Sequence, residues 1–539
     1  MTNRLYYGDN LEWLARAEAF VEGSVDLVYL DPPFNSNANY NVLFREPGGG
    51  AAESQIEAFQ DTWHWNESAE AAFARVLREG GTGVAELLRA MLGFLGRNDL
   101  TAYLAMMAVR MVALRRVMAE TASLYLHCDP TASHYLKLLL DAAFGPDNFR
   151  AEFIWKRSSA HSDGKQGRRL PGCIHDVILF YTKSDRWTWN TVYTPYDAVY
   201  VENFYRYEDE AGRRYRLDNL SGPGGKDKGN PSYEVMGVTR YWRYTREKMA
   251  ALVAEGRVIQ TRPGAVPAYK RYLDEMQGVP LQDLWTDIGP IAAQAAERLG
   301  YPTQKPLALL ERIIQVSSNP GDLVLDPFCG CGTAVHAAEK LGRRWAGIDI
   351  TYLAINLIER RLREAFPGIA FSVEGAPRDL PSAQDLARRD KYQFQWWAVA
   401  QVGARPWQGK KKGADGGIDG IIYFTGFDAG GKPRSERAIV SVKGGTQRSL
   451  SMVAELVETI QRQNAPIGIL LLAALPTREM EARAAAAGFV EGYEGVPRIQ
   501  MLTLAELFEG KRPRIPNIDA ATFRRAEEET GRGQGGLAL

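Results

Sequence analysis

Several residue types and patterns are scarce in this sequence, and each scarcity excludes a class of protein. The chain has 4 cysteines among 539 residues, too few for the disulfide framework of a small secreted protein. Its longest apolar run, IGILLLAAL, is shorter than the roughly 20 residues that span a bilayer as a helix. The first ten residues, MTNRLYYGDN, contain no apolar signal core. We therefore expect a reduced, cytoplasmic protein without a membrane partner.

The sequence also lacks an excess of either charge. Lys and Arg number 65, Asp and Glu number 65, and the formal net charge is zero. A nucleic-acid partner must therefore be met by a local basic patch and not by the field of the whole protein. The length exceeds what one hydrophobic core can hold, so we expect about two to four domains.

Strand-like and helix-like segments alternate at both ends of the first 370 residues. VDLVYL and SLYLHCD predict buried strands, and LAMMAVRMVALRRVM predicts a helix with an apolar face that leaves Arg110 mostly off it. After residue 321 the order is the strand GDLVLD, a helix from about Thr333, and the strand RRWAGID. This alternation predicts an α/β protein with a largely parallel sheet.

The remaining segments predict the domain organisation. The range 185–285 is irregular and rich in Tyr, Arg and Gly, which indicates a module inserted into a domain spanning 1–372. A polar, proline-broken stretch at 373–390 predicts a linker. A smaller α/β unit is expected at 391–512, followed by a disordered tail at 513–539.

The stretch VLDPFCGCGTAVHAAEKLGRRWAGID predicts a nucleoside-binding loop. Gly330 and Gly332 allow a tight turn and a close approach to a ligand. Asp349 ends the next strand, where an acid can accept hydrogen bonds from ribose hydroxyls. A Walker phosphate loop is excluded because Thr333 follows the last glycine without a lysine. Asp326 would repel phosphate but suits a cationic ligand such as a sulfonium; the alternative is a simple strand–helix turn.

Two motifs together resemble the signatures of S-adenosylmethionine-dependent DNA amino-methyltransferases. DPPF comes first and FCGCG follows much later, which is the permuted order of the β group. The resemblance covers about residues 1–370 and extends to GDNLEWL, LYLHCDPTASHYLK, HDVILFYTKS and YPTQKPLALLERIIQVSSNPGDLVLDPFCGCGT. It implies a Rossmann-like methyltransferase sheet with permuted motif order, S-adenosylmethionine as cofactor, and double-stranded DNA as partner.

The resemblance also implies which residues hold the cofactor. The methionine part would be contacted by Asp326, Phe328, Gly330, Gly332 and Thr333. The segment that closes over it would be Thr303, Gln304, Lys305 and Pro306. Asp349 would hold the ribose, and Asp9 would lie near the adenine.

The resemblance also implies a role for DPPF, whose Asp31 places a carboxylate directly after the buried strand VDLVYL. An exocyclic amino group is a poor nucleophile because its lone pair is delocalised into the base. Asp31 and the backbone carbonyl of Pro32 would accept its two N–H bonds, and Pro33 would hold that carbonyl rigidly. Phe34 would stack on the base once it leaves the duplex. Methyl transfer of this kind needs no metal.

Basic side chains following a predicted strand are candidates for DNA binding. FIWKRSSAHSDGKQGRRL carries Lys156, Arg157, Lys165, Arg168 and Arg169 against a single acid. These cations would contact phosphates in a DNA enzyme, and a solvated charged loop is the alternative. The insert at 185–285 lies where the β group carries its target-recognition domain, and its Arg and Tyr content is typical of base reading.

The unit at 391–512 resembles the Mrr-like branch of the PD-(D/E)xK restriction-endonuclease fold. Asp419 in GIDG matches its first acid, and Lys443 in SVK matches its lysine. Ser441 stands where Glu or Gln is usual, and Gln395 stands where a helix acid is common. An active nuclease would need Mg²⁺, with Asp419 as a ligand. The alternative is a module that binds DNA without cutting it.

These observations predict a site-specific DNA methyltransferase that methylates adenine N6 in flipped-out bases of duplex DNA. An acid at the start of the DPPF motif is more usual for adenine, although a cytosine-N4 enzyme remains the alternative. A single-chain restriction–modification enzyme, in which the C-terminal unit cleaves DNA, is a further alternative. The resemblance leaves two protein partners open, a second copy of the chain and a subunit of a restriction–modification system.

Overall fold

The computed structural model describes residues 3–33, 38–45, 51–61, 64–159, 171–292, 294–299, 301, 303–407, 417–427, 432–445 and 447–516. These residues form two compact units. One unit combines Met1–Asn190 with Asp283–Gly536, and the second consists essentially of Thr191–Gln282. Across the described residues, the search for a helix both long and apolar enough to traverse a bilayer finds none.

A nine-stranded sheet forms the centre of the first unit, in the order β16-β6-β7-β5-β2-β17-β18-β1-β19. Its strands are β1 (Asn3–Tyr7), β2 (Val25–Leu30), β5 (Met118–Cys128), β6 (Phe149–Lys156), β7 (His175–Thr182), β16 (Leu284–Trp285), β17 (Leu323–Asp326), β18 (Arg344–Asp349) and β19 (Phe371–Glu374). Each pairing is parallel except those of β7 with β5 and β6. The predicted Rossmann-like methyltransferase sheet is thereby confirmed.

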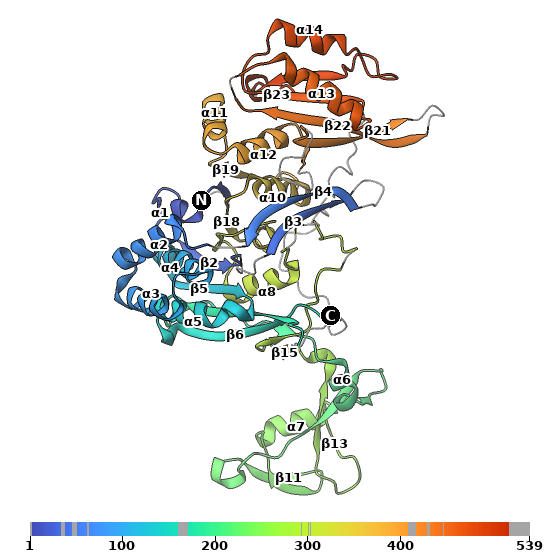
Figure 1. Cartoon of the computed structure of the whole chain (residues 1–539). Coiled ribbons are helices and arrows are strands. Elements are labelled where there is room, and N and C mark those ends of the chain that lie inside the picture. Colours follow the sequence, from blue (N-terminus) through green and yellow to red (C-terminus); the bar gives the residue numbers. More distant parts are fainter. Residues whose placement is uncertain are drawn as a thin grey trace. The chain divides into compact units, whose positions relative to one another are not determined.

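Helices cover both faces of this sheet (Figure 1). They are α1 (Asn10–Ala15), α2 (Glu67–Glu79), α3 (Gly81–Leu95), α4 (Asp99–Val117), α5 (Pro130–Phe144), α8 (Leu307–Ser317), α9 (Thr333–Lys340) and α10 (Tyr352–Ala365). The helix α4 packs against α1, α2 and α5. Its apolar residues share a core with Val28 and Leu30 of β2, so these two side chains mark the face of the sheet that α1–α5 cover. A separate antiparallel pair is formed by β3 (Ala38–Arg45) and β4 (Ala51–Asp61).

The second unit is built from short antiparallel strands around a small core. Its four-stranded sheet has the order β13-β14-β10-β9, and a hairpin and a strand pair accompany it. The elements are β8 (Tyr193–Thr194), α6 (Ala198–Phe204), β9 (Tyr207–Glu208), β10 (Arg214–Asn219), η3 (Gly225–Lys228), β11 (Ser232–Val235), β12 (Val238–Tyr241), α7 (Arg246–Ala254), β13 (Val258–Ile259), β14 (Ala268–Tyr272), η4 (Leu273–Glu275) and β15 (Val279–Pro280). Trp242, fully buried, lies in the core of this unit.

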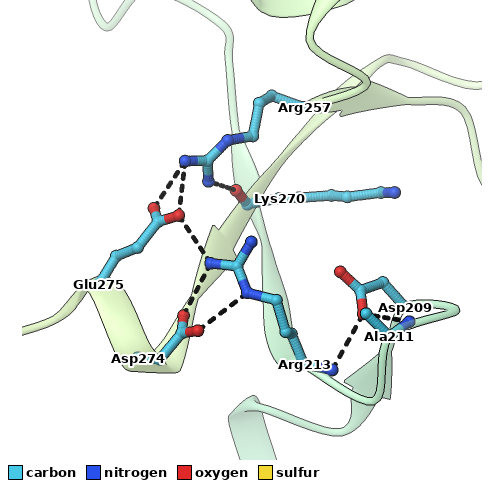
Figure 2. Close-up of polar contacts among 7 residues, drawn as sticks. All are labelled: Asp209, Ala211, Arg213, Arg257, Lys270, Asp274 and Glu275. Carbon is cyan, nitrogen blue, oxygen red and sulfur yellow. Dashed lines mark hydrogen bonds and ion pairs between the residues drawn. The ribbon is translucent and has the colours of Figure 1, made fainter.

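Internal ion pairs hold the turn that follows β14. Figure 2 shows Arg213 between Asp274 and Glu275, with Nε 2.8 Å and Nη2 2.9 Å from their carboxylates. Arg257 donates two hydrogen bonds to the same Glu275, and Asp209 accepts two backbone N–H bonds within its own turn. Part of the Arg content of this insert therefore serves its own fold.

A five-stranded sheet forms the C-terminal part of the first unit, in the order β20-β21-β22-β23-β24. Its elements are α11 (Leu380–Arg389), α12 (Lys391–Gln401), β20 (Arg405–Pro406), β21 (Gly420–Phe427), β22 (Pro433–Lys443), α13 (Leu450–Arg462), β23 (Ile467–Leu472), α14 (Arg478–Ala486), β24 (Ile499–Thr503) and α15 (Leu504–Phe508). The strands β21 and β22 are antiparallel, and β22, β23 and β24 are parallel.

The linker predicted at 373–390 contains regular structure instead. The strand β19 enters the nine-stranded sheet beside β1, and α11 occupies most of the remaining residues. Asp379 caps α11 by accepting from Ser382 N at 2.8 Å, and Pro381 falls in the first turn, where a proline is tolerated. Pro381 thus marks the start of a helix, and Pro377 lies in the short irregular segment before it. Of the predicted disordered tail, residues 517–539 lie outside the described part of the chain.

Candidate active site

A cavity of about 540 Å³ lies at the carboxyl edge of β2, β17 and β18. Parallel strands bring their carboxyl ends to one edge, so the three acids that end or follow these strands meet there. Asp31, Asp326 and Asp349 all line this cavity. The other predicted residues that line it are Asp9, Pro32, Pro33, Thr303, Lys305, Phe328, Gly330 and Thr333. The cavity therefore joins the DPPF motif to the glycine loop.

Asp31 forms an ion pair with Lys305. The Lys305 Nζ lies 2.5 Å from Asp31 Oδ2, and both side chains are largely buried. Lys305, predicted to close over the cofactor, is therefore the partner of the predicted catalytic acid. The pair neutralises one negative charge of the cavity and leaves Asp31 Oδ1 as a further acceptor.

The glycine loop forms as its sequence predicts. Gly330 and Gly332 have φ of 49° and 76°, in the left-handed region that favours glycine. A Cβ on Gly330 would lie 3.2 Å from the ring of Tyr301, so a side chain there would have to displace that ring slightly. Asp326 is buried at the end of β17 and accepts from Phe328 N at 3.1 Å. Burial, followed by the nearby Asp31 and Asp349 carboxylates, raises the pKa of Asp326 well above its ordinary value.

Asp349 is held by donors from both sides of its strand end. Its Oδ1 accepts from Thr351 N and Thr351 Oγ1, each at 2.8 Å, and its Oδ2 accepts from Gly330 N at 2.9 Å. Burial raises the pKa of Asp349 to about 6, although these donors favour its ionised form. The carboxylate links the glycine loop to β18, and its Oδ2 keeps a lone pair for a ligand hydroxyl.

Asp9 lines the cavity and belongs to a partly buried network. It caps α1 by accepting from Leu11 N at 2.7 Å. Arg110 of α4 donates to Asp9 Oδ2 at 2.9 Å and to Asn10 Oδ1 at 2.6 Å. Asn10 in turn donates to the carbonyl of Pro327 at 2.8 Å, which ties α1 to the start of the glycine loop.

Three predicted cofactor residues do not line the cavity. The Gln304 amide donates to the carbonyl of Glu297 at 2.5 Å and accepts from Leu299 N at 2.8 Å, which shapes the preceding loop. Pro306 precedes α8 at its N-cap position, and Gly332 precedes α9 in the same way. Their cofactor contacts stay predictions. Phe34 lies outside the described residues.

Sequence reasoning missed several residues of this site, among them Arg110 and Tyr301. Arg110 was expected mostly off the apolar face of its helix, but it is buried and lines the cavity. An arginine inside the apolar run LAMMAVRMVAL was the available signal, because a buried guanidinium needs an acidic partner. Tyr301 also lines the cavity, and its ring packs on Gly330.

The described part of the basic segment contains two of its five predicted DNA-contacting residues. Lys156 ends β6 and is exposed. Arg157 follows it, and its Nε lies 2.9 Å from Asp176 Oδ1. Lys165, Arg168 and Arg169 lie outside the described residues.

In the C-terminal part, Asp419 lies among hydrogen-bond donors that include the predicted residues Gln395 and Ser441. Asp419 accepts hydrogen bonds from the Gln395 amide, from Val442 N at 2.5 Å and from Ser441 Oγ at 3.4 Å. Lys443 pairs with Glu455 of α13 at 3.5 Å. No cluster of three His, Cys, Asp or Glu side chains able to hold a metal occurs within the described ranges. Among the described residues, Asp419 already accepts three donors, and its neighbours Gln395 and Ser441 are an amide and a hydroxyl, so they add no second carboxylate for Mg²⁺.

Comparison with known proteins points to one family. The family model described as DNA methylase matches residues 25–360. The type II methyltransferase M.EcaI of Enterobacter cloacae is 31% identical over 264 residues, which are 48% of this chain and 57% of that protein. The Mod subunit of the type III restriction-modification enzyme StyLTI of Salmonella typhimurium is 25% identical over 359 residues, 64% of this chain and 51% of that subunit. The chain thus covers little more than half the length of each.

The solved structures include a similar arrangement at low identity. The putative DNA modification methylase TTHA0409 of Thermus thermophilus, in complex with S-adenosyl-L-methionine, is 16% identical, with a TM-score of 0.34. The match covers 70% of this chain and 100% of that protein.

Proposed function

This chain belongs to the DNA methylase family, and we propose that it transfers a methyl group from S-adenosylmethionine to adenine N6 in duplex DNA. One observation carries the proposal. The cavity holds Asp31 of the DPPF motif together with Asp326 and Asp349 of the glycine-loop region, so an acceptor for a base amine and a cradle for a cationic nucleoside share one space.

The residues around the glycine loop fit the cofactor chemically. A sulfonium nucleoside carries a positive charge and two ribose hydroxyls, and it supplies a methyl group already bound to a good leaving group. Asp349 would accept one ribose hydroxyl through the free lone pair of Oδ2. The backbone at Gly330 and the carboxyl of Asp326 would surround the methionine part, where a positive charge offsets the burial of the acid.

The base amine would be met by Asp31 and the carbonyl of Pro32. Hydrogen bonds to both N–H groups draw the nitrogen toward tetrahedral geometry and free its lone pair. Lys305 would orient the carboxylate through Oδ2 while Asp31 Oδ1 faces the amine. Because the reacting atoms need only in-line alignment, positioning supplies the rest of the rate. Phe34 would stack on the extruded base.

Adenine is the proposed target because the DPPF motif begins with an acid, the more usual form for adenine in this family. Cytosine N4 carries the same kind of amine and is the second candidate.

The DNA itself would be bound by Lys156, Arg157, Lys165, Arg168 and Arg169, and by the insert, the proposed target-recognition domain. The insert has exposed basic side chains around β11 and β12 that would contact the DNA, namely Lys226, Lys228, Arg240, Arg243, Arg246 and Lys248. The remaining predicted partners, a second copy or a restriction–modification subunit, stay proposals.

For the C-terminal unit we propose DNA binding without cleavage. The donor set around Asp419 supports this reading over a Mg²⁺-dependent nuclease, because Asp419, Gln395 and Ser441 satisfy one another. The resemblance to a restriction-endonuclease fold is then one of architecture, which the order and directions of β21, β22 and β23 support.

The direct test identifies the methylated nucleoside. The full chain is incubated with methyl-labelled S-adenosylmethionine and mixed-sequence duplex DNA, which is then digested to nucleosides. We expect label in N6-methyl-2′-deoxyadenosine; label in N4-methyl-2′-deoxycytidine would refute adenine specificity, and no label would refute the function. The matched control is Asp31→Ala, in which the activation free energy of methyl transfer should rise by about 3 kcal/mol or more. Its affinity for the cofactor, measured by calorimetry, should stay near that of the wild type.

A further inference from the structure

A buried chain of hydrogen bonds runs from the cavity through Tyr29, His127 and Asp176, which the proposed reaction does not use, to the exposed Arg157. Tyr29 of β2 lines the cavity, and its hydroxyl lies 3.0 Å from His127 Nδ1. His127 Nε2 lies 3.0 Å from Asp176 Oδ2. Asp176 Oδ1 is 2.9 Å from Arg157, whose side chain is 44% exposed. These residues come from β2, β5, β7 and the end of β6.

This network occupies a place that apolar residues could fill. Tyr29 is 2% exposed, His127 0% and Asp176 4%. Burial of polar and charged groups is costly unless each finds its partners, and apolar residues of similar shape are often no less stable. Two of the residues belong to the motifs LYLHCD and HDVILFY, whose polar positions the cofactor and base contacts leave unexplained. A role beyond packing is therefore indicated.

The direction of each hydrogen bond follows from the acid at the outer end. An ionised Asp176 only accepts, so the proton of a neutral His127 lies on Nε2 and points to it. Nδ1 is then an acceptor, and the Tyr29 hydroxyl donates to it. Tyr29 is thus held in one orientation by a histidine whose tautomer Asp176 selects, as in a Ser-His-Asp triad.

The end of β2 needs such an anchor. Ladder pairing of β2 with β17 stops at Val28, and pairing with β5 stops at Leu30. Asp31 comes next, followed by two prolines that have no N–H to donate. Tyr29 and Asp31 are two residues apart, so they lie on the same face of the strand, opposite Val28 and Leu30.

We propose that Tyr29, His127 and Asp176 are positioning residues that hold Asp31 in the geometry needed for methyl transfer. Tyr29 restrains the last paired residues of β2 from the side on which Asp31 lies. His127 and Asp176 hold Tyr29, and Arg157 balances the charge of Asp176. This inference rests on the proposed methyltransferase function and adds residues to that same site.

The test compares two buried hydroxyls on neighbouring strands. Tyr29→Phe removes the hydroxyl of the network, whereas Tyr125→Phe removes one that bonds to Ser317 Oγ at 2.7 Å and does not line the cavity. Tyr125 lies directly opposite Tyr29 in the sheet and is equally buried. We expect Tyr29→Phe to lower kcat by about tenfold or more, with KM for DNA and Kd for S-adenosylmethionine within about twofold of wild type. Tyr125→Phe should keep wild-type kcat.

A third variant separates positioning from loss of packing. Asp176→Asn keeps the size of the side chain, but its amide can donate to His127 Nε2 and move the proton to Nδ1, so Tyr29 loses its acceptor. We expect the same fall in kcat as in Tyr29→Phe, and no further fall in the double variant, because both changes break one network. Thermal unfolding checks that each variant is folded. If Asp176→Asn does not fold, the comparison of Tyr29→Phe with Tyr125→Phe is the test.

The outcomes distinguish this inference from the function on which it rests. A wild-type kcat in Tyr29→Phe, or an equal fall in both tyrosine variants, would overturn the positioning role while wild-type transfer upholds the methyltransferase. A wild-type protein without methyl transfer would instead overturn the proposed function, and the inference with it.

Discussion

Asp31 and Asp349 are carboxylates of one cavity, yet their surroundings differ. Asp31 has the ammonium of Lys305 as its partner. Among the described residues, Asp349 accepts hydrogen bonds from the N–H groups of Gly330 and Thr351 and from the Thr351 hydroxyl, and its burial raises its pKa to about 6. Asp326 is shifted in the same direction by burial. The charge of the cavity around neutral pH is therefore set by how each acid is buried and partnered.

At this scale we predict that affinity for S-adenosylmethionine falls as the pH is lowered through about 6. A ribose hydroxyl donates to ionised Asp349, so binding favours the ionised form and the bound pKa lies below that of the free protein. The affinity should then weaken by up to about tenfold per pH unit below about 6. The stability of the fold has the opposite pH dependence. Because burial raises the pKa of Asp349, its contribution to the free energy of unfolding is lost as the pH rises through about 6.

Calorimetry between about pH 5 and pH 8 checks this dependence. The control is Asp349→Asn, which should bind about tenfold more weakly and lose the part of the pH dependence that belongs to this group. Asp326 acts in the same direction, and the control leaves its contribution in place. A wild-type Kd that stays constant over this range would contradict the assignment of Asp349 to the ribose.

Among the elements, the β17–α9 turn depends on a glycine at one position. Gly332 precedes α9 with φ of 76°, and its N–H donates to the carbonyl of Cys329 at 2.6 Å. A Cβ at Gly332 would lie 2.8 Å from Ile358 of α10. The left-handed backbone and the packing of α10 therefore require glycine at the same position, although Gly332 does not line the cavity.

We predict that Gly332→Ala lowers the free energy of unfolding by about 2–4 kcal/mol, through backbone strain and the clash with Ile358. The matched control is Gly342→Ala, where φ is 71° but a Cβ would meet nothing within 4 Å. It should cost only about 1–2 kcal/mol, which is the strain alone. Urea denaturation measures both. Equal losses in the two variants would show that α10 gives way and that packing does not select this glycine.

On the scale of the whole molecule, the C-terminal unit is joined to the cofactor region by its helix α12. Gln393 accepts from Tyr352 N at 3.0 Å, at the start of α10. Trp396 packs against the cluster of Tyr301, Cys331 and Leu353. Gln395, on the same helix, bonds to Asp419. One helix therefore contacts both the glycine-loop region and the Asp419 centre.

We predict that the full chain does not nick plasmid DNA with Mg²⁺ or Mn²⁺, on methylated or unmethylated substrate. The conservative change Asp419→Asn should leave methylation unchanged, because amine chemistry uses no metal and the variant keeps the size of the side chain. DNA binding should be unchanged or slightly tighter, since a negative charge is removed. Metal-dependent nicking by wild type that disappears in Asp419→Asn and Lys443→Ala would reject binding without cleavage.

The sequence by itself determined the local features of this protein. The spacing of apolar residues predicted the alternation of strands and helices. Such alternation predicts a parallel sheet, because the connecting helices must cover its two faces. The glycine loop and the placement of Asp31, Asp326 and Asp349 at one edge followed from the same rule, since each acid stands at the carboxyl end of a parallel strand. These features depend on neighbours in the chain, so the chain order reveals them.

Only the tertiary structure decided which side chains meet across that edge. The pair of Asp31 with Lys305, the pair of Asp9 with Arg110, and the network of Tyr29, His127 and Asp176 each join residues far apart in the sequence. In the C-terminal unit, the motifs predicted that Asp419 and Lys443 belong to one centre. The structure shows that the oxygens of Asp419 accept hydrogen bonds from Gln395, Ser441 and Val442. Strand register and helix packing set these contacts, and neither is written in the periodicity of any one segment.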